Sequence, residues 1–490
     1  MRYISTRNKA EAVSFSRAAL EGLAEDGGLF IPQVIPTYRD AVRKSLASMS
    51  FPEIAFETIR PYVEGELADS VLQELCAGAF SFTAPLVPAD TGAEASGVPL
   101  VMELFHGPTA AFKDFGARFM ARTFSLLRRG EDRPLRILVA TSGDTGGAVA
   151  DGFFGVEGMF VTVLYPKGRV SELQEKQIAG LGGNISALAV EGSFDDCQAL
   201  VKDAFRDGAL RERLALSSAN SINISRLIPQ AVYYAAAAGK ALAGLWDGDG
   251  EATPRAAGVP GGTPRGADGG GGCGRGRPGN ARPPRPVMFC VPSGNFGNLT
   301  AGLYALSMGA PIAGFIAATN INKTVPDYLA SGEYKTRLSQ ATISNAMDVG
   351  APSNFERMAA HWNYDELRRM IRGVYVTDDE TRQTIADVYR SHGYFLDPHG
   401  AVGWTAADKS RKADDGAVDG AADGGAATEG TARVVVAATA HPAKFSETVE
   451  SITGPVPVPV SIQKAMGRTA RAVTIPADLS ALRDILLSEA

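Results

Sequence analysis

Short runs of Val, Ile and Leu recur along this 490-residue chain, separated by longer stretches with helical periodicity. Strands this apolar are buried on both faces, which is typical of a parallel sheet covered by helices on each side. The alternation therefore predicts an α/β protein, in which ligands gather at the loops after the carboxyl ends of the strands. The clearest runs are residues 136–140, 160–165, 287–291 and 434–438.

The length predicts more than one domain, because 490 residues exceed one ordinary hydrophobic core. Hydrophobic residues make up 45% and charged residues 21%, a normal balance for a globular protein. Residues 15–23 and 66–75 have helical patterns and precede the first strong strand. We expect an N-terminal α/β cap domain at 1–98, a large domain at 99–120 and 287–465, a small α/β domain at 121–246, and a C-terminal segment at 466–490.

Two segments consist almost wholly of small and polar residues. They cover residues 247–286, which include four consecutive glycines at 269–272, and residues 413–430. Segments with so few large apolar residues cannot bury enough surface to offset the entropy of ordering. We expect both to be disordered surface insertions.

Composition also argues against several classes of function. A net charge of -6 gives no electrostatic case for binding nucleic acid or an anionic membrane. The four cysteines show no Cys-x-x-Cys spacing and the five histidines are scattered, so we expect neither a disulfide framework nor a metal site. No apolar run is long enough for a signal peptide or a spanning helix. These features predict a protein of the reducing cytoplasm.

The first motif that carries chemistry spans residues 106–116 and contains Lys113 between Phe112 and Phe115. The pattern predicts that a helix begins at this lysine. Apolar neighbours and a helix N-terminus both disfavour the ammonium form and lower its pKa. A neutral amine is what imine formation requires. Taken alone, the lysine is better explained as a surface side chain lying along an amphipathic helix.

The second motif, residues 141–147, is a glycine-rich turn directly after a strand, and we expect a helix to begin near Gly147. Free backbone N–H groups at a helix start, with Thr141 and Ser142 hydroxyls beside them, form a site for a carboxylate or phosphate. An ordinary strand-to-helix turn explains the same residues equally well.

The third motif, residues 293–298, follows the strand at 287–291. It lacks the Gly-Lys-Ser/Thr of an ATP-binding P-loop and misses the spacing of the dinucleotide fingerprint, which argues against both classes. Converging N–H groups in such a loop can hold one phosphate monoester, although the motif alone is a weak signal that a plain strand-to-helix turn also explains.

The fourth motif, residues 220–226, places amides, hydroxyls and Arg226 close together. Donors of this kind clamp a phosphate, although a helix N-cap with a solvent-facing Arg226 is the simpler interpretation of this motif alone. The fifth motif, residues 438–444, ends the last strand with Thr439, whose hydroxyl can face a ring nitrogen, and with His441, which we expect to be a packed turn residue.

Three further stretches are less informative. Residues 348–357 and 397–403 are polar loops that either line the site or only shape it, and residues 169–176 are interpreted as a charged helix start.

Together the five motifs resemble those of the threonine synthase family, within the fold-type-II group of pyridoxal phosphate enzymes. The resemblance runs from Tyr3-Ile4-Ser5-Thr6-Arg7 through residues 22–29 to residues 441–445, and covers nearly the whole chain except the two insertions. Five motifs in the family order are far more specific than any one alone. The resemblance implies a tryptophan synthase β-like architecture, with two parallel-sheet domains plus an N-terminal domain.

The resemblance also implies roles for matching positions. Lys113 would hold pyridoxal 5'-phosphate through a Schiff base, and Thr439 would face the ring nitrogen. The cradle of the cofactor phosphate matches Gly294, Asn295, Phe296, Gly297 and Asn298. The loop for the substrate α-carboxylate matches Thr141, Ser142, Asp144 and Thr145. The group that grips the substrate phosphate matches Asn220, Ser221 and Arg226.

One position departs from a related branch, which has Asn where Asp144 stands. An ionised carboxylate only accepts hydrogen bonds, so the contact of Asp144 with a cofactor oxygen stays open.

The reaction implied by the resemblance converts O-phospho-L-homoserine and water into L-threonine and phosphate, with Lys113 moving protons between substrate carbons. It implies a lyase of threonine biosynthesis with a small-molecule substrate, working as a monomer or homodimer without nucleic acid, membrane or metal. Two alternatives remain at this point. A serine/threonine dehydratase would share Lys113 and both glycine-rich loops but would not need Arg226. A non-catalytic synthase-like binding protein would not need Lys113.

Overall fold

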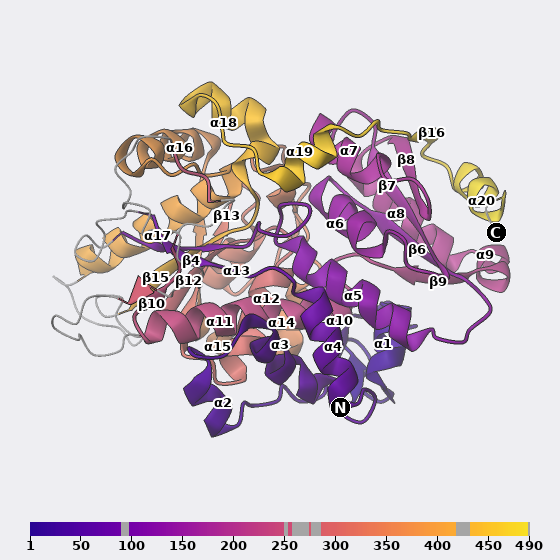
Figure 1. The fold of residues 1–490 in the computed structure, drawn as a ribbon, viewed down its shortest axis with the longest axis horizontal. Helices are drawn as coiled ribbons and strands as arrows, with labels where there is room; N and C mark the ends of the chain where they lie inside the picture. The colour runs from indigo at the N-terminus through magenta and orange to yellow at the C-terminus, as the bar shows by residue number, and fades with distance from the viewer. Residues whose placement is uncertain (90–97, 249–252, 257–273, 276–285, 418–431, 489–490) are drawn as a thin grey trace, which may run out of the picture.

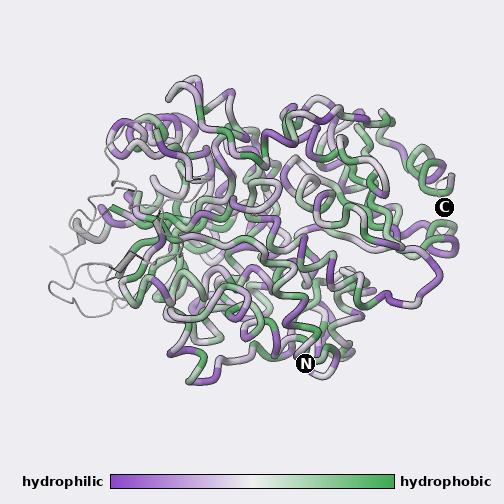
Figure 2. The backbone as a smooth tube through the Cα atoms, viewed as in Figure 1, coloured by the Kyte–Doolittle hydropathy of each residue, from purple (hydrophilic) through white to green (hydrophobic). Residues whose placement is uncertain are grey.

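The computed structural model describes residues 1–89, 98–248, 253–256, 274–275, 286–417 and 432–488. Figure 1 shows two α/β lobes side by side, one built around β12 and β13 and the other around β6, β7 and β8. The N-terminal helices lie along one side of this pair. Hydrophobic residues are concentrated in the central strands, whereas outer helices such as α16 carry hydrophilic residues (Figure 2).

The larger sheet has the strand order β14-β13-β12-β15-β5-β4. Its strands are parallel except β4, which runs antiparallel to β5 at the edge. The central strand β12 is buried along its whole length, as its apolar sequence predicted. The strands are β4 (Leu86–Pro88), β5 (Leu100–Glu103), β12 (Val287–Pro292), β13 (Ile312–Thr319), β14 (Ile371–Tyr375) and β15 (Arg433–Ala438).

The smaller sheet is parallel throughout, in the order β16-β8-β7-β6-β9. Its strands are β6 (Leu135–Ala140), β7 (Met159–Pro166), β8 (Ile185–Glu191), β9 (Ala215–Ser218) and β16 (Val473–Pro476). Its helices are α6 (Asp144–Phe153), α7 (Glu172–Ala179), α8 (Phe194–Arg206), α9 (Gly208–Arg213) and α20 (Leu479–Ser488).

The N-terminal part forms a three-stranded antiparallel sheet in the order β2-β1-β3, with helices packed beside it. Glu66 accepts hydrogen bonds from the N–H groups of Phe15 and Ser16, so a carboxylate lies at the start of α1, where the helix dipole favours it. The elements are β1 (Tyr3–Ser5), β2 (Ala12–Val13), β3 (Phe30–Pro32), α1 (Phe15–Glu21), α2 (Asp40–Ser45), α3 (Phe51–Ile59), η1 (Arg60–Tyr62) and α4 (Asp69–Ala79).

The remaining helices cover the larger sheet or join the lobes. They are α5 (Lys113–Leu127), α10 (Ile224–Leu227), η2 (Ile228–Gln230), α11 (Ala231–Leu242), α12 (Gly297–Ser307), α13 (Thr324–Ser331), η3 (Asn345–Met347), α14 (Phe355–His361), α15 (Tyr364–Met370), α16 (Asp378–His392), α17 (Pro398–Ala417), η5 (Pro442–Phe445), α18 (Ser446–Thr453) and α19 (Val460–Met466). A two-stranded pair joins β10 (Leu245–Trp246) to β11 (Gly274–Arg275).

Strand pairing crosses two of the predicted domain boundaries. β4 lies within the predicted cap at 1–98 but pairs with β5 of the larger sheet. β16 lies within the predicted C-terminal segment at 466–490 but extends the smaller sheet beside β8. Short edge strands carry too weak a periodic signal to assign them to a sheet from sequence.

Both predicted insertions lie mostly outside the described residues, but their described ends are structured. Asp247 forms an ion pair with Lys240 at 2.7 Å, and Arg255 donates to the carbonyls of Pro88 and Ala89. Residues 413–417 continue α17. Described, hydrogen-bonded or helical residues therefore continue past the predicted start of each insertion.

Other features of the described chain concern membranes, thiols and metals. No helix among the described residues combines the length and hydropathy needed to cross a membrane. Cys76, Cys197 and Cys290 are buried and form no disulfide among the described residues, and Cys273 lies outside those residues. Within the same described ranges, no three His, Cys, Asp or Glu side chains group as metal ligands.

Candidate active site

Lys113 is the first residue of α5, as predicted, and backbone contacts fix it beside the end of β15. Ala111 forms an antiparallel bridge with Ala440, and the Phe112 N–H donates to the Thr439 carbonyl at 2.9 Å. Thr439 itself is buried. The first and fifth sequence motifs therefore meet, although more than 300 residues separate them.

The Lys113 side chain is 15% exposed, and its Nζ lies 3.6 Å from Asp144 Oδ2. Burial lowers the pKa of this amine, as the sequence predicted; Lys444 and Arg226 lower it further, while Asp144 opposes them. The site therefore favours a larger share of neutral amine than an exposed lysine has.

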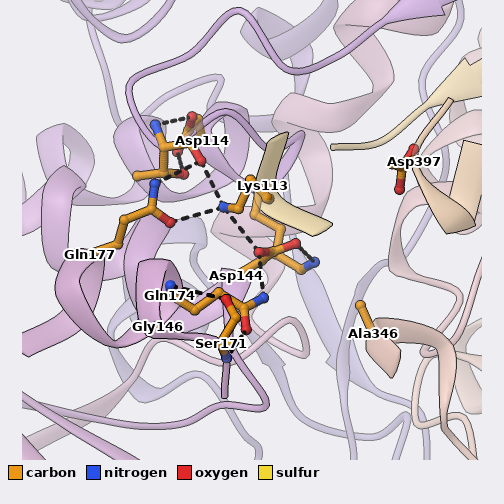
Figure 3. A network of polar contacts seen from close by, with 12 residues as sticks. Lys113, Asp114, Asp144, Gly146, Ser171, Gln174, Gln177, Ala346 and Asp397 are labelled. Atoms are coloured by element: carbon orange, nitrogen blue, oxygen red, sulfur yellow. Dashed lines mark hydrogen bonds and ion pairs between the residues drawn. The ribbon is translucent and has the colours of Figure 1, made fainter. Parts of the chain in front are cut away.

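Asp144 begins α6, three residues earlier than the helix start predicted near Gly147. Gly143 makes this early start possible, because its φ of 143° closes the turn in a conformation that residues with a Cβ avoid. Asp144 Oδ1 accepts from Gln174 Nε2 at 3.0 Å and from Lys444 Nζ at 3.0 Å (Figure 3). Burial raises the pKa of Asp144, but the charges of Lys444 and Lys113 outweigh it and hold that pKa well below its usual range.

The other predicted residues of this loop divide into two kinds. Thr141 is buried, and its hydroxyl accepts from the N–H groups of Gly143 and Gly146, both at 2.9 Å, so it shapes the turn. Ser142 and Thr145 are half-buried at the start of α6, where the first N–H groups of a helix lack intrahelical partners. Because both Asp144 oxygens face lysines and an ionised carboxylate cannot donate, Asp144 is poorly suited to the substrate carboxylate contact predicted for it.

The loop between β12 and α12 holds its backbone close to neighbouring chain. A Cβ on Gly294 would lie 2.7 Å from Met347 Cα and 2.9 Å from the Ala346 carbonyl, so only glycine fits without displacement. Phe296 adopts a left-handed conformation with φ 58°, which turns the chain into α12 at Gly297. Asn298 is buried and fastens the loop, accepting from Ser293 Oγ at 2.7 Å and donating to the Pro292 carbonyl at 2.9 Å.

The third and fourth motifs meet through Asn295. Its Nδ2 donates to Ser221 Oγ at 2.7 Å, and its Oδ1 accepts from the Ser353 N–H at 2.5 Å. Asn354 Nδ2 donates to the Asn295 carbonyl at 3.0 Å. The loop predicted for the cofactor phosphate therefore lies against the loop predicted for the substrate phosphate.

Arg226 is 2% exposed, not solvent-facing as its motif alone suggested. Its Nη1 donates to the Ala219 carbonyl at 2.6 Å, but within the described part of the chain its buried Nε has no hydrogen-bond partner, and neither does the buried Asn220 Oδ1. Burial lowers the pKa of Arg226 to about 10. Among the described residues this guanidinium makes no ion pair. A buried cation without a counter-charge is suited to bind an anionic ligand.

Sequence reasoning left two loops open, and the structure shows that both shape the site. Arg357, fully buried, donates to the Phe30 carbonyl at 3.1 Å, to Asn354 Oδ1 at 2.7 Å, and to the Ile222 carbonyl. The Ala346 N–H donates to His399 Nε2 at 3.3 Å, which leaves Nδ1–H to donate to Asp397 at 2.7 Å.

Sequence reasoning missed the buried polar side chains of α7 and η5. Residues 169–176 do begin a helix, but Gln174 and Gln177 on α7 are buried and reach Asp144 and the Thr109 carbonyl. Lys444 lies within the fifth motif, whose pattern predicted no role for it. The sequence feature that could have identified it is a lysine that follows shortly after the end of an apolar strand. His441 is buried and packs edge-to-face on Phe105, as predicted for a turn residue.

Comparison with known proteins places this site in a family. The threonine synthase N-terminus model matches residues 2–80, the pyridoxal-phosphate dependent enzyme model matches 81–248 and 279–439, and the threonine synthase C-terminal model matches 400–486. Threonine synthase of Haemophilus influenzae is 38% identical over 95% of this chain and 94% of its own length.

Solved structures agree in fold over the full length. The crystal structure of threonine synthase from Escherichia coli superposes with a TM-score of 0.80 at 36% identity and covers 100% of both chains. The PLP-bound threonine synthase from Brucella melitensis gives a TM-score of 0.80 at 34% identity over 99% of this chain and 98% of that one. The fold-type-II architecture predicted from sequence is confirmed, and this chain belongs to the threonine synthase family of pyridoxal-phosphate-dependent enzymes.

Proposed function

We propose that this chain catalyses the conversion of O-phospho-L-homoserine and water to L-threonine and phosphate. Proteins named threonine synthase match this chain over nearly the whole length of both sequences. The observation that carries the proposal is Arg226, a buried cation without an ion pair among the described residues, whose charge acts on Lys113. A phosphorylated substrate supplies the missing anion, whereas an unphosphorylated amino acid leaves the guanidinium buried and uncompensated.

The residues present fit pyridoxal phosphate. Lys113 would hold the aldehyde carbon, because burial favours its neutral amine. The backbone between Gly294 and Gly297 would hold the phosphate, since it is kept free of side-chain bulk at Gly294 and leads into the start of α12. Thr439 would face the ring nitrogen. When bound, the cofactor supplies an electron sink for the charge that develops on the substrate carbons.

The chain itself provides binding and proton transfer in this proposal. Arg226, Asn220 and Ser221 bind the substrate phosphate, and Arg226 Nε, a donor with no partner among the described residues, provides unused bonding capacity there. Ser142 and Thr145, with the N–H groups at the start of α6, bind the α-carboxylate. Lys113 Nζ accepts a proton from the substrate α-carbon and returns it.

Two measurements test the proposal. Borohydride reduction of the holoenzyme followed by peptide mapping should place the pyridoxyl group on Lys113. Purified enzyme should release phosphate from O-phospho-L-homoserine with L-threonine as product. Formation of 2-oxobutyrate from threonine as the main activity would instead identify a dehydratase, and the absence of an imine absorbance band after added cofactor would indicate a binding protein.

The partner, the cellular compartment and the oligomeric state are also part of the proposal. A net charge of -6 supports a small-molecule partner over nucleic acid, and buried thiols at Cys76 and Cys197 suit a reducing cytoplasm. We propose a monomer or homodimer, which light scattering coupled to size-exclusion chromatography decides.

A further inference from the structure

Lys444 is a buried lysine to which the proposed function assigns no role. Its side chain is 0% exposed. Its Nζ contacts the Thr109 carbonyl at 2.7 Å, Gln177 Oε1 at 3.0 Å and Asp144 Oδ1 at 3.0 Å. Three acceptors match the three donors of an ammonium group. Lys444 is therefore a cation with every N–H in use, and it cannot supply the neutral amine that Lys113 provides.

The three acceptors belong to three different segments, so Lys444 is held rigidly. Thr109 lies in the turn before α5, Gln177 on α7 and Asp144 at the start of α6. Gln177 Nε2 also donates to the Thr109 carbonyl at 3.2 Å, which closes the network. Lys444 extends from η5, after the last strand of the larger sheet, and its charge is fixed against helices of the smaller lobe.

Asp144 lies between Lys444 and Lys113, with one oxygen directed to each. Oδ1 receives Lys444 and Gln174, and Oδ2 lies 3.6 Å from Lys113 Nζ. In a buried site, removing one partner of such a pair leaves the other charge uncompensated, which is strongly unfavourable. Lys444 thus makes it possible for Asp144 to stay ionised at 4% exposure, whether or not Lys113 carries a proton.

Resting on the proposed function, we infer that Lys444 is a positioning residue that maintains Asp144 as a permanent carboxylate beside Lys113 Nζ. When Lys113 takes a proton from the substrate, Asp144 Oδ2 stabilises the resulting ammonium. When Lys113 returns that proton, neither Asp144 nor Lys444 has gained or lost one. Lys444 also limits the stabilisation, because its own charge, together with that of Arg226 on α10, repels the Lys113 ammonium.

Lys444 accounts for the Asp at this buried position. A buried carboxylate is tolerated here because η5 supplies a dedicated cation. Asp144 and Lys444 then act as one unit, and breaking the unit from its two ends has opposite effects on Lys113.

The test is the pH midpoint of Lys113 acylation by acetic anhydride, followed by peptide mass spectrometry on the full chain freed of cofactor. Lys444→Met removes a repelling charge and leaves both Asp144 oxygens to Lys113. We expect the pH midpoint of Lys113 acylation to rise by about one unit in this variant. At a fixed pH below the midpoint, Lys113 would then have about tenfold less neutral amine. Asp144→Asn removes the stabilising anion, so its midpoint should fall by about one unit.

Lys409→Met is the matched control. Lys409 forms an exposed ion pair with Glu380 at 2.7 Å, so its removal should leave the Lys113 midpoint unchanged. A folded Lys444→Met protein with a wild-type midpoint would overturn the inference. If that variant does not fold, Asp144→Asn decides, and an unshifted midpoint there also overturns it. Mapping of the reduced cofactor to another lysine would defeat the proposed site separately, because the acylation midpoint does not depend on cofactor.

Discussion

The two glycine-rich loops, residues 141–145 after β6 and residues 293–298 after β12, share one local design and differ in what holds them. Each leads from a parallel strand into a helix, and each contains one residue with positive φ, Gly143 in the first and Phe296 in the second. In the first loop the helix begins with Asp144, whose two oxygens face Lys444 and Lys113.

The second loop is held by neutral groups. Asn298 bonds to Ser293 and to the Pro292 carbonyl, and Asn295 bonds to Ser221. Backbone N–H groups at a helix start bind an anion without a built-in counter-charge, provided that no carboxylate competes for them. We propose that one scaffold serves two tasks here: charges at the first loop shift the pKa of Lys113, and the neutral amides at the second leave backbone N–H groups available to a phosphate.

Removal of Lys113 should have the largest effect, because it takes away the group that the charged loop serves. We expect Lys113→Ala to lose the imine absorbance and at least about 10³-fold in phosphate release. Lys167→Ala, at an exposed pair with Glu191, is the control and should keep wild-type activity. A Lys113→Ala enzyme within tenfold of wild type would contradict the assignment of proton transfer to this loop.

Substitution of Arg226 tests whether this residue binds the substrate phosphate or the cofactor phosphate. Arg226→Met should lower kcat/KM for the phosphorylated substrate by about 10²-fold, the value of a charge-assisted contact, while the bound cofactor content stays unchanged. Arg226→Lys keeps the charge but loses the planar fork and should fall between the two. A loss of cofactor equal to the loss of activity would place Arg226 at the second loop's phosphate instead.

Much of the fold could be predicted because its signals are local. The apolar runs that became β6, β7, β12 and β15 lie within one residue or so of the predicted bounds. The start of α6 was missed by three residues, because the turn depends on the φ of Gly143, which sequence does not reveal. The edge strand β16 was missed because it has a single buried residue, Ile475.

The site was less predictable, because its charges are paired across the chain. Lys113 and Asp144 were found through motifs, but the contact between them depends on how the two lobes meet. Lys444 was visible in the sequence beside His441, yet its burial and three acceptors arise from segments more than 260 residues away. Long-range packing of this kind leaves no periodic pattern.

Glycine substitutions test whether the two loops fail in different ways. Gly143→Ala would place a Cβ about 2.4 Å from the Gln174 amide nitrogen, and Gly294→Ala would place one 2.7 Å from Met347 Cα. Each should lower the free energy of unfolding by about 1–3 kcal/mol. Beyond this loss of stability, Gly143→Ala should shift the pH midpoint of Lys113. Gly294→Ala should instead weaken cofactor binding and leave that midpoint unchanged. Gly208→Ala, with open space around it, is the control, and identical effects at both loops would contradict the division of tasks.

The smallest expected effect concerns a hydrogen bond between the two helices that follow the second loop and Asn354. Tyr304 on α12 hydrogen-bonds to His361 on α14 at 3.0 Å, so His361 ties the helix after the second loop to the helix after Asn354. Burial, with a further contribution from Arg357, lowers the pKa of His361 to about 4.

Between that value and the ordinary histidine value the unfolded chain binds more protons than the folded one, so stability falls as pH drops through this window. We expect wild-type protein to lose at most about 2 kcal/mol from this group between pH 7 and pH 5, measured by urea unfolding. His361→Phe should flatten that slope without moving the Lys113 titration, because His361 supports the neutral loop. A variant that keeps the full slope would show that the acid sensitivity arises elsewhere. A variant that shifts the Lys113 titration would show that the two loops are coupled.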